Sequence, residues 1–347
     1  MSVKDFIKVL VPTKLRRILR ERTVSTSVKQ LHGPKKIKLS SNEAAVTCLV
    51  KNGEYYMESF ISHYTEMGFR HIFFLDNGST DQTIAIAKRH KNVSVCQSTL
   101  PVSIYQGMFK KYLALNCLEG GWCLDADIDE FFDYPYADIV SLREFFDYLN
   151  RKHFTAVITQ LLDMFSDKPV AHLAQQQDED VKMAYQYFDL SNMTKSSYSG
   201  SSIVAEYGNK NGVSNGQAAL FYGGIRKTLY GNDCLLTKHS LFFPKKEMDL
   251  FSHVHFVNNA KLADVSGAML HYKLTSNALI IAMQNRDRFL ANADTYSEFI
   301  DLINKKPDYQ IKQNTAVKYD TARELVECGF LFVSEEYREY AKGFDRK

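Results

Sequence analysis

The sequence has few of the features that assign a protein to a class at once. Its six cysteines are scattered, no two of them form a CxxC pair, and no cysteine–histidine spacing resembles a zinc site. No stretch approaches the run of about 18 apolar residues that spans a membrane, and no apolar segment with a small-residue cleavage site opens the chain. We therefore expect reduced thiols in a cytosolic protein that neither spans a membrane nor carries a secretory signal.

Two common phosphate-binding motifs are also absent. The chain contains neither the GxGxxG of dinucleotide-binding folds nor the GK[ST] of a P-loop, and it shows no internal repeat. A nucleotide bound by this protein would therefore need a metal ion to hold its phosphates.

The residues that are present form an ordinary globular composition, 45% hydrophobic and 24% charged, but their charge is unevenly distributed. Residues 1–38 contain eleven Lys and Arg against two acidic residues, a net charge of +9 in a chain whose total is +3. The basic charge is therefore concentrated at the N-terminus and does not cover the whole surface.

The first 22 residues combine this charge with apolar residues. Leu15, Ile18 and Leu19 recur at helical spacing between arginines, and Pro12 is expected to divide the segment into two short helices. Such basic amphipathic segments lie on anionic membrane surfaces, so we expect residues 1–22 to contact the inner face of the cytoplasmic membrane. Packing on the protein's own body is the alternative. No platform of basic and aromatic residues follows, so no nucleic acid is expected, and residues 23–40 are typical of a linker.

Strand and helix patterns alternate from residue 44 onward. Buried strands are predicted at 44–50, 71–75, 93–96, up to about 125 and at 155–160, with helices between them at about 56–67, 84–87, 106–118 and 141–152. This alternation predicts an α/β fold with a mostly parallel sheet and helices on both faces. Residues 161–222 show no clear pattern, 223–243 and 251–272 are typical of antiparallel strands, and helices are expected near 275–290 and in the tail.

Four carboxylates follow one of these strands within six residues. Asp125, Asp127, Asp129 and Glu130 come directly after the apolar Trp122–Leu124 segment. Carboxylates this close repel one another, and the commonest use of such crowding is a divalent cation with oxygen ligands. At the carboxyl end of a strand they would lie where open α/β sheets bind ligands. A solvated acidic turn is the alternative.

A second polar loop follows the strand at 71–75. In Asp76–Asp81, Gly78 permits a tight turn, and Asp81 or the hydroxyls before it can cap the next helix. Capping alone is the structural interpretation. The functional hypothesis is that Asp76 and its neighbours contact a nucleotide base or ribose at the same sheet edge.

Together these motifs resemble the nucleotide-sugar-dependent glycosyltransferases of family 2, which have the GT-A fold, and more narrowly a bacterial branch of that family. The match covers roughly residues 44–290, and Gly53 is a departure, inserted where the family has Asn directly followed by Glu. The motifs are the Val50-Lys51-Asn52-Gly53-Glu54 turn, His63-Tyr64 before Gly68, Asp76-Asn77-Gly78-Ser79-Thr80-Asp81, Asp127-Ile128-Asp129-Glu130-Phe131 and His271-Tyr272-Lys273.

The resemblance implies a set of site residues. Asp127 and Asp129 would hold Mn²⁺ or Mg²⁺ on the donor diphosphate, with Asp125/Asp127 as the alternative pair and His271 as a third ligand or a diphosphate contact. Asp233 or Glu130 would be the base that takes the proton of the acceptor hydroxyl. The expected nucleotide and diphosphate contacts are Asn52, Glu54, Asp76, Asn77, Ser79, Asp125, Arg226 and Lys227.

These roles predict a metal-dependent, inverting glycosyltransferase. It would use a UDP-sugar and a saccharide or lipid-linked acceptor in bacterial surface polysaccharide or lipopolysaccharide synthesis. Its expected organisation is a basic segment and linker at 1–40, a GT-A domain at 41–290 and a helical extension at 291–347. The alternatives are a nucleotide- or carbohydrate-binding protein without turnover and a metal-dependent nucleotidyl or phosphoryl transferase. The latter would need a phosphate loop that the sequence lacks.

Overall fold

A computed structural model describes residues 13–169, 180–214, 216–275, 305–306 and 308–345. The first of the two expected N-terminal helices, and residues 276–290 of the expected later helix, lie outside this range. The helices are α2 (Thr13–Ser27), α3 (Glu54–Met67), α4 (Thr83–Ala87), α5 (Val102–Asn116), α6 (Leu142–Arg151), α8 (Val181–Ala184), α9 (Ser202–Tyr207), α10 (Ile225–Tyr230), α13 (Ala322–Glu327) and α14 (Glu335–Lys342).

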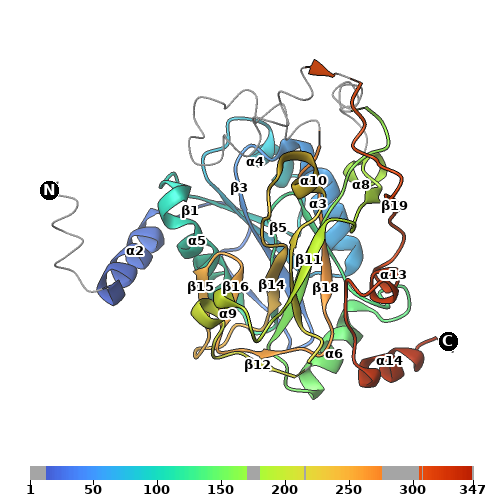
Figure 1. Ribbon diagram of the computed structural model, residues 1–347. Coiled ribbons are helices and arrows are strands. Elements are labelled where there is room, and N and C mark those ends of the chain that lie inside the picture. The colour runs from blue at the N-terminus through green and yellow to red at the C-terminus, as the bar shows by residue number, and fades with distance from the viewer. Residues whose placement is uncertain (1–12, 170–179, 215, 276–304, 307, 346–347) are drawn as a thin grey trace, which may run out of the picture.

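A central, mostly parallel sheet organises the molecule (Figure 1). Its strand order is β1-β5-β4-β3-β7-β14-β9-β17-β12, with β18 pairing with β9 and β8 pairing with β18. The strands are β1 (Lys29–His32), β3 (Ala44–Val50), β4 (His71–Asp76), β5 (Val93–Gln97), β7 (Trp122–Asp125), β8 (Glu130–Asp133), β9 (Ala156–Asp163), β12 (Gly212–Val213), β14 (Thr237–Phe242), β17 (Lys261–Leu262) and β18 (Gly267–His271).

The parallel core of this sheet confirms the predicted fold class. Strands β5, β4, β3 and β7 run parallel, β14 is antiparallel to both β7 and β9, and β18 is parallel to β9. This mixed α/β arrangement is the one expected of a GT-A fold. Four small two-stranded sheets accompany it: β2 (Ile37–Lys38) with β6 (Leu118–Glu119), β10 (Tyr187–Phe188) with β19 (Val317–Lys318), β11 (Met193–Ser197) with β13 (Ala219–Gly223), and β15 (Asp249–His253) with β16 (Phe256–Asn258).

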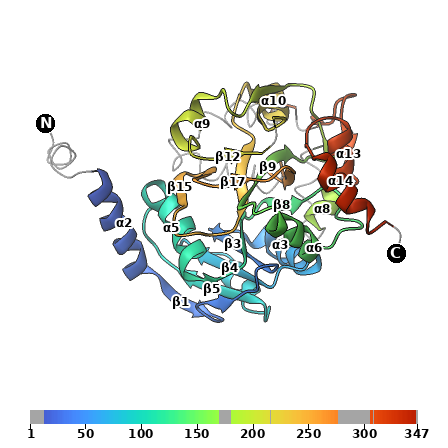
Figure 2. The ribbon, with the colours of Figure 1, turned by 90° about the horizontal axis from the view of Figure 1, so that it is seen from below.

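Helices cover both faces of the sheet because successive strand residues point to opposite sides. In β3, Val46 and Cys48 pack into a core that also contains residues of α3, α6, α13 and α14, whereas Ala45 packs into a second core with α2, α5 and α9. Figure 2 shows α5 on one side of the strands and α3 with α6 on the other. The sheet is therefore buried on both faces, as its continuous apolar strands predict.

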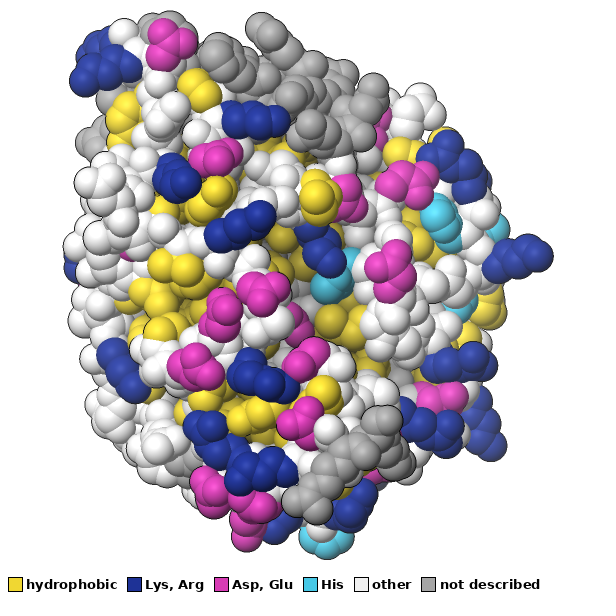
Figure 3. All heavy atoms as spheres, turned by 90° about the vertical axis from the view of Figure 1, so that its right-hand side faces the viewer, with side chains coloured by type: hydrophobic (Ala, Val, Ile, Leu, Met, Phe, Trp, Pro, Cys, Tyr) yellow, Lys and Arg dark blue, Asp and Glu magenta, His cyan; other side chains and the backbone are white. Residues whose placement is uncertain are grey.

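Local signals set the helix ends. Gly68 adopts a left-handed conformation (φ 103°) and ends α3, as predicted. Ser141 and Glu144 form a reciprocal capping box at the start of α6, which confirms the helix expected from about residue 141. In the tail, α13 and α14 confirm the expected terminal helices. Acidic and basic side chains are interspersed with apolar ones on the face of the molecule where α13 and α14 lie (Figure 3).

Several segments differ from their predictions. Within 251–272, expected as antiparallel strands, β17 and β18 run parallel to β9, although β18 is antiparallel to β8. Residues 23–27, expected in a linker, belong to α2. Residues 29–32, expected in a linker, form β1, which pairs antiparallel with β5 at the sheet edge. Residues 225–230, expected to be part of an antiparallel strand, form α10. Gly223 and Gly224 before this helix, and Gly231 after it, all have positive φ, so the strand ends and a short helix is inserted. The domain boundaries at residues 40 and 290 stay predictions.

No helix within these described ranges combines the length and the apolar character needed to cross a membrane. All six cysteines are free thiols, and four of them are buried.

Candidate functional site

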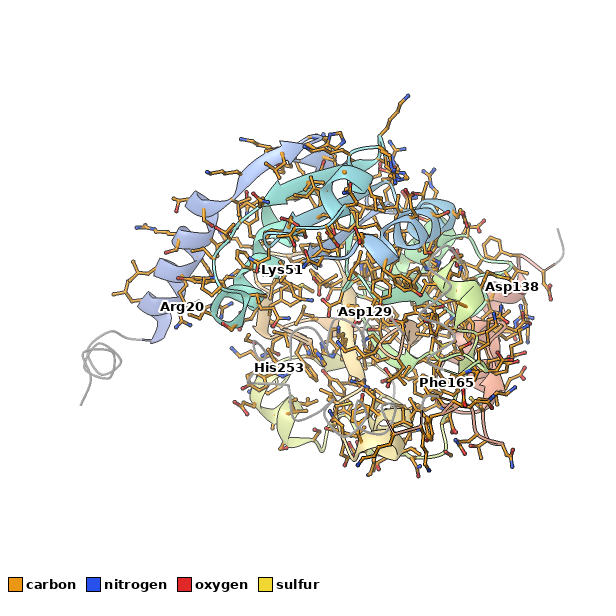
Figure 4. The ribbon with its side chains drawn as sticks, turned by 90° about the horizontal axis from the view of Figure 1, so that it is seen from above. Arg20, Lys51, Asp129, Asp138, Phe165 and His253 are labelled. Atoms are coloured by element: carbon orange, nitrogen blue, oxygen red, sulfur yellow. The ribbon has the colours of Figure 1, made fainter. Side chains whose placement is uncertain are left out.

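The loops after β3, β4 and β7 meet at the carboxyl edge of the sheet. Val50 lies opposite Asp76, and Thr47 lies opposite Asp125, in the parallel register. In the view from above, Lys51 and Asp129 lie on neighbouring loops (Figure 4). The two polar loops that the sequence placed at one sheet edge are therefore brought together.

Hydrogen bonds join the first two loops into one rim. The backbone N–H of Asn52 donates to Ser79 Oγ over 2.8 Å, and the Thr80 N–H donates to Asn52 Oδ1 over 2.8 Å. The Gln82 N–H donates to the Glu54 carboxylate over 2.7 Å. Asn52 has a left-handed φ of 53°, which asparagine tolerates better than most residues. The rim is thus preorganised by its own polar side chains.

Asp76 and Asn77 form the inner part of this rim. The Asp76 carboxylate is fully buried and accepts the Gly78 N–H over 2.9 Å and the Gln97 side-chain amide over 2.8 Å. Asn77 donates its side-chain amide to the Ser98 carbonyl over 2.7 Å. Both side chains therefore shape the loop, and their predicted contact with a nucleotide stays a prediction.

The His63-Tyr64 motif positions the segment that follows the acidic loop. Tyr64 donates its hydroxyl to the Glu130 carbonyl over 2.8 Å and accepts the Phe132 N–H over 3.0 Å, and His63 Nε2 lies 2.9 Å from the Phe132 carbonyl. The fully buried Phe131 packs edge-to-face against Tyr272. This motif therefore fixes β8, and with it the end of the acidic loop.

Three of the four carboxylates alternate with two lysines. Lys110 Nζ lies 2.7 Å from Asp125 Oδ2 and 2.9 Å from Asp127 Oδ1, while Lys238 Nζ lies 3.1 Å from Asp127 Oδ2 and also contacts Glu130. We call Asp125, Lys110, Asp127, Lys238 and Glu130 the charge chain. The Asp127 side chain is 36% exposed, whereas the other four are at most 5% exposed.

The charge chain explains how the crowded carboxylates coexist. Burial tends to raise the pKa of Asp127, but the ammonium groups of Lys110 and Lys238 outweigh it and hold that pKa well below its usual range. Asp125 is more deeply buried, and burial raises its pKa to about 6 although Lys110 opposes the shift. The pKa values of both lysines are raised, because their carboxylate partners overcome the effect of burial.

The two lysines were missed in the sequence. Lys110 lies next to the buried Phe109 on the inward face of α5, and Lys238 lies in a strand whose residues are all buried. A lysine on a buried helical or strand face is unusual unless it is paired. That placement is the signal that could have identified both residues.

A second polar line runs behind Asp129. His271 Nε2 lies 3.6 Å from Asp129 Oδ2, and His271 Nδ1 lies 2.6 Å from Asp163 Oδ1. Arg226 Nε donates to Asp163 Oδ2 over 2.7 Å. Asp163 was not predicted as a site residue, because the strand was expected to end at residue 160. It lies directly opposite His271 in the parallel register of β9 and β18.

Neighbouring charges shift the pKa values of His271, Asp129 and Asp163. Burial lowers the pKa of His271, but Asp129 and Asp163 outweigh it and raise that pKa above its usual value. Burial raises the pKa of Asp129, yet His271 and Lys273 bring it below its usual range. Arg226 and His271 similarly lower the pKa of Asp163 against the effect of burial. The predicted diphosphate contact Arg226 is therefore engaged with Asp163.

The side chains at this edge include oxygen and nitrogen donors that a divalent cation could use. Across the described part of the chain, no three Asp, Glu, His or Cys side chains converge as a ready-made metal cage. Asp129 and His271 nevertheless have room for a shared cation, because two ligands at about 2.1 Å and at right angles lie about 3 Å apart, and His271 Nε2 lies 3.6 Å from Asp129 Oδ2. A carboxylate on the far nitrogen of the histidine is the usual orienting partner of a metal ligand.

The two candidates for the base, Asp233 and Glu130, are held by other partners. Asp233 is on the surface, 54% exposed, and its carboxylate pairs with Lys227 over 3.2 Å. The Glu130 carboxylate is buried, contacts Lys238 and accepts the Asp127 N–H over 3.0 Å. The identity of the base stays a prediction.

Comparisons with known proteins add a limited likeness. No protein-family model matches the chain, and no curated protein matches it significantly. Part of the structure is similar to crystal structures of glucosyl-3-phosphoglycerate synthase from Mycobacterium tuberculosis. One contains Mn²⁺, UDP and glucosyl-3-phosphoglycerate, and matches with 19% identity and a TM-score of 0.26 over 35% of this chain and 44% of that chain. A second structure, with Mn²⁺ and UDP-glucose, has the same identity and TM-score, and the match covers 43% of that chain. At these values the likeness carries no argument about activity.

Proposed function

We propose that this protein is a metal-dependent, inverting glycosyltransferase that takes a sugar from a nucleoside diphosphate donor, most simply a UDP-sugar. The acceptor is a saccharide or lipid-linked saccharide of bacterial surface polysaccharide or lipopolysaccharide synthesis. The supporting observation is the pairing of Asp129 with an imidazole that Asp163 orients. This pair lies at the same sheet edge as the preorganised rim of residues 52–54 and 76–82. The donor class, the acceptor and inversion come from the sequence resemblance.

The residues at this edge have different proposed roles. Asp129 and His271 would hold Mn²⁺ or Mg²⁺, and the partly exposed Asp127 would be the third ligand. The bound metal supplies Lewis-acid stabilisation of the charge that develops on the leaving diphosphate. The rim receives the nucleoside, and Lys273, whose Nζ lies 3.9 Å from Asp129, adds positive charge beside the diphosphate.

A carboxylate must also take the proton of the acceptor hydroxyl. Of the two candidates, Asp233 has the solvent-accessible carboxylate, whereas the Glu130 carboxylate is buried against Lys238. We therefore assign the base to Asp233 and a loop-holding role to Glu130. Replacing Asp233 with Asn should lower kcat. It should leave nucleotide affinity within about threefold of the wild-type value, because a base that acts only on the acceptor does not contribute to nucleotide binding.

The test is a screen of nucleotide sugars for metal-dependent release of nucleoside diphosphate. The wild-type protein should release it from at least one donor with Mn²⁺ or Mg²⁺, and Asp129→Ala and His271→Ala should lower the rate by at least about a hundredfold. Asp138→Asn, in an exposed ion pair with Arg323, is the control. Binding of a donor without turnover would indicate a binding protein, and full activity in Asp129→Ala would refute the metal assignment.

The N-terminal helix supports a place at a membrane surface. In Figure 1, α2 extends away from the body. The helix is fixed to the body near its C-terminal end by Val24, which is 1% exposed and packs into the second core, and also by two ion pairs, Arg17 with Asp249 over 2.5 Å and Glu21 with Lys111 over 2.7 Å. Closer to its N-terminal end apolar residues face solvent, with Leu15 46% and Leu19 49% exposed. Packing of the helix on the body, the alternative considered from the sequence, therefore holds for Val24 but not for Leu15 and Leu19.

We propose that the exposed apolar residues Leu15 and Leu19 of α2, together with the exposed Arg20 and Arg22, contact the anionic inner surface of the cytoplasmic membrane. The joint change Leu15→Ser/Leu19→Ser should reduce flotation with vesicles that contain phosphatidylglycerol, because it removes apolar area that would be buried in the membrane. Val317→Ser, an exposed apolar residue in β19, is the matched control. Equal flotation of the double variant and the wild type would contradict the membrane contact.

A further inference from the structure

Asp127 is held differently from Asp129, although both belong to the same motif. Each Asp127 carboxylate oxygen lies within 3.1 Å of a lysine ammonium, Oδ1 of Lys110 and Oδ2 of Lys238. Asp129 instead faces an imidazole and the more distant Lys273. A cation that uses Asp127 as a ligand must therefore take an oxygen that already binds an ammonium group.

The lysines cannot simply leave when a cation arrives. Each one is anchored from the inside by a second carboxylate: Lys110 by Asp125 and Lys238 by Glu130. All four of these side chains are buried, and separating a buried ion pair exposes uncompensated charge at a high cost in free energy. Asp127 is the part of the charge chain that reaches solvent, so an incoming cation meets Asp127 first, with both ammonium groups directly behind it.

The charge of this region depends on what else is bound. The charge chain contains three carboxylates and two ammonium groups, and so has a net charge of −1 with all of them ionised. A divalent cation on Asp127 alone would sit beside two positive groups that repel it. A nucleoside diphosphate bound to the same cation would bring negative charge that replaces the Asp127 carboxylate as a partner of the two ammonium groups.

We propose that Lys110 and Lys238 compete with the divalent cation for Asp127, so that the free protein binds the metal weakly and a nucleoside diphosphate strengthens that binding. This inference rests on the proposed function for the identity of the diphosphate. Coupling of this kind is reciprocal: the metal must strengthen diphosphate binding by the same factor. Lys110 and Lys238 are then positioning residues that link the two binding events.

The experiment measures Mn²⁺ affinity by electron paramagnetic resonance on the full-length protein, with and without UDP, after correction for the Mn²⁺–UDP complex formed without protein. Lys110 is the better lysine to change, because Glu130 also accepts the Asp127 N–H and supports the loop. The variants are Lys110→Met, Asp125→Asn and the double variant Lys110→Met/Asp125→Asn. Lys111→Met, which removes the neighbouring ammonium that pairs with Glu21 on the surface, is the control.

The variants separate competition from the general electrostatic field. Lys110→Met makes the charge chain more negative and frees an oxygen of Asp127, so Mn²⁺ should bind about tenfold more tightly without UDP. The double variant keeps the net charge and still frees that oxygen, so without UDP it should bind Mn²⁺ at least about threefold more tightly than the wild type. Asp125→Asn leaves Lys110 with Asp127 as its remaining partner, and should weaken Mn²⁺ binding.

UDP supplies the second readout. It should tighten Mn²⁺ binding about thirtyfold or more in the wild type and in Lys111→Met, but less than about tenfold in the double variant. Unchanged Mn²⁺ affinity in a folded double variant, or equal UDP coupling in the double variant and the wild type, would overturn the competition. The function proposal fails separately: it fails if the wild type turns over no nucleotide sugar, whatever its Mn²⁺ affinity.

Discussion

Asp163 offers the most direct test of how the site is organised. Its carboxylate lies between His271 Nδ1, at 2.6 Å, and Arg226 Nε, at 2.7 Å, and it is buried with both partners. Asp163→Asn keeps the shape and the hydrogen-bonding oxygen of the side chain but removes its charge. The imidazole then loses part of what raises its pKa and fixes its orientation, and the guanidinium loses its ionic partner.

Two separate effects are expected. Removing one member of a buried ion pair costs about 3–5 kcal/mol, and the lower part of that range applies here, because the amide oxygen still accepts a hydrogen bond. Removing the orienting carboxylate of a metal-binding histidine typically lowers metal affinity by about 10–100-fold. The first effect is measured by urea unfolding, and the second by Mn²⁺ titration in the presence of UDP.

A double variant distinguishes a positioning role from a structural one. In Asp163→Asn/Arg226→Gln no unpaired guanidinium remains, so most of the lost stability should return while the metal affinity stays low. Asp138→Asn, which breaks the exposed pair with Arg323, should change stability by less than about 1 kcal/mol and leave metal affinity unaltered. Wild-type Mn²⁺ affinity in the stable double variant would refute the view that Asp163 orients His271.

Three further predictions concern stability. His63 and His239 are buried, and burial lowers their pKa values to about 3 and about 4. Below pH 6.5 each histidine therefore gains a proton only on unfolding, and the protein loses about 1.4 kcal/mol of stability per histidine for each pH unit until the folded pKa is reached. His63→Gln should therefore make the urea midpoint fall less steeply as pH is lowered, and an unaltered pH dependence of that midpoint would contradict this. Phe131→Ala should destabilise by about 3–5 kcal/mol, and a loss below about 1 kcal/mol would show that its core is loosely packed. In Gly107→Ala the new Cβ meets a β15 carbonyl oxygen at 2.8 Å, which should cost about 1–3 kcal/mol, whereas Gly216→Ala has free space and should cost less.

The parts of the fold that depend on local pattern could be predicted from the sequence. The alternation of strands and helices from residue 44 to 160 indicated the sheet, and Gly68 marked the end of α3. The Asp76 loop and the acidic loop could be placed at one edge because both follow parallel strands, whose carboxyl ends coincide. These inferences need only periodicity and chain direction.

The parts that depend on distant pairing could not be predicted in this way. Lys238 reaches Asp127 because β14 inserts antiparallel between β7 and β9, and sequence periodicity does not specify that neighbour. Asp163 meets His271 through the register of β9 and β18, which a slip of one residue would have destroyed. The turn glycines that insert α10 were also visible, but their positive φ values were not.

The antiparallel insertion of β14 also affects the order in which contacts form as the protein is synthesised. The acidic loop at residues 125–130 leaves the ribosome long before Lys238 and His271, so its carboxylates initially have only Lys110 among their eventual buried cationic partners. Pairings between residues so far apart in the chain form slowly, because a long loop must close before any contact stabilises it. The charge chain is therefore completed late in folding. A nascent chain that ends before β14 should leave unpaired the edges of the apolar strands β7 and β9 that β14 later joins, and should depend on chaperones until that strand arrives.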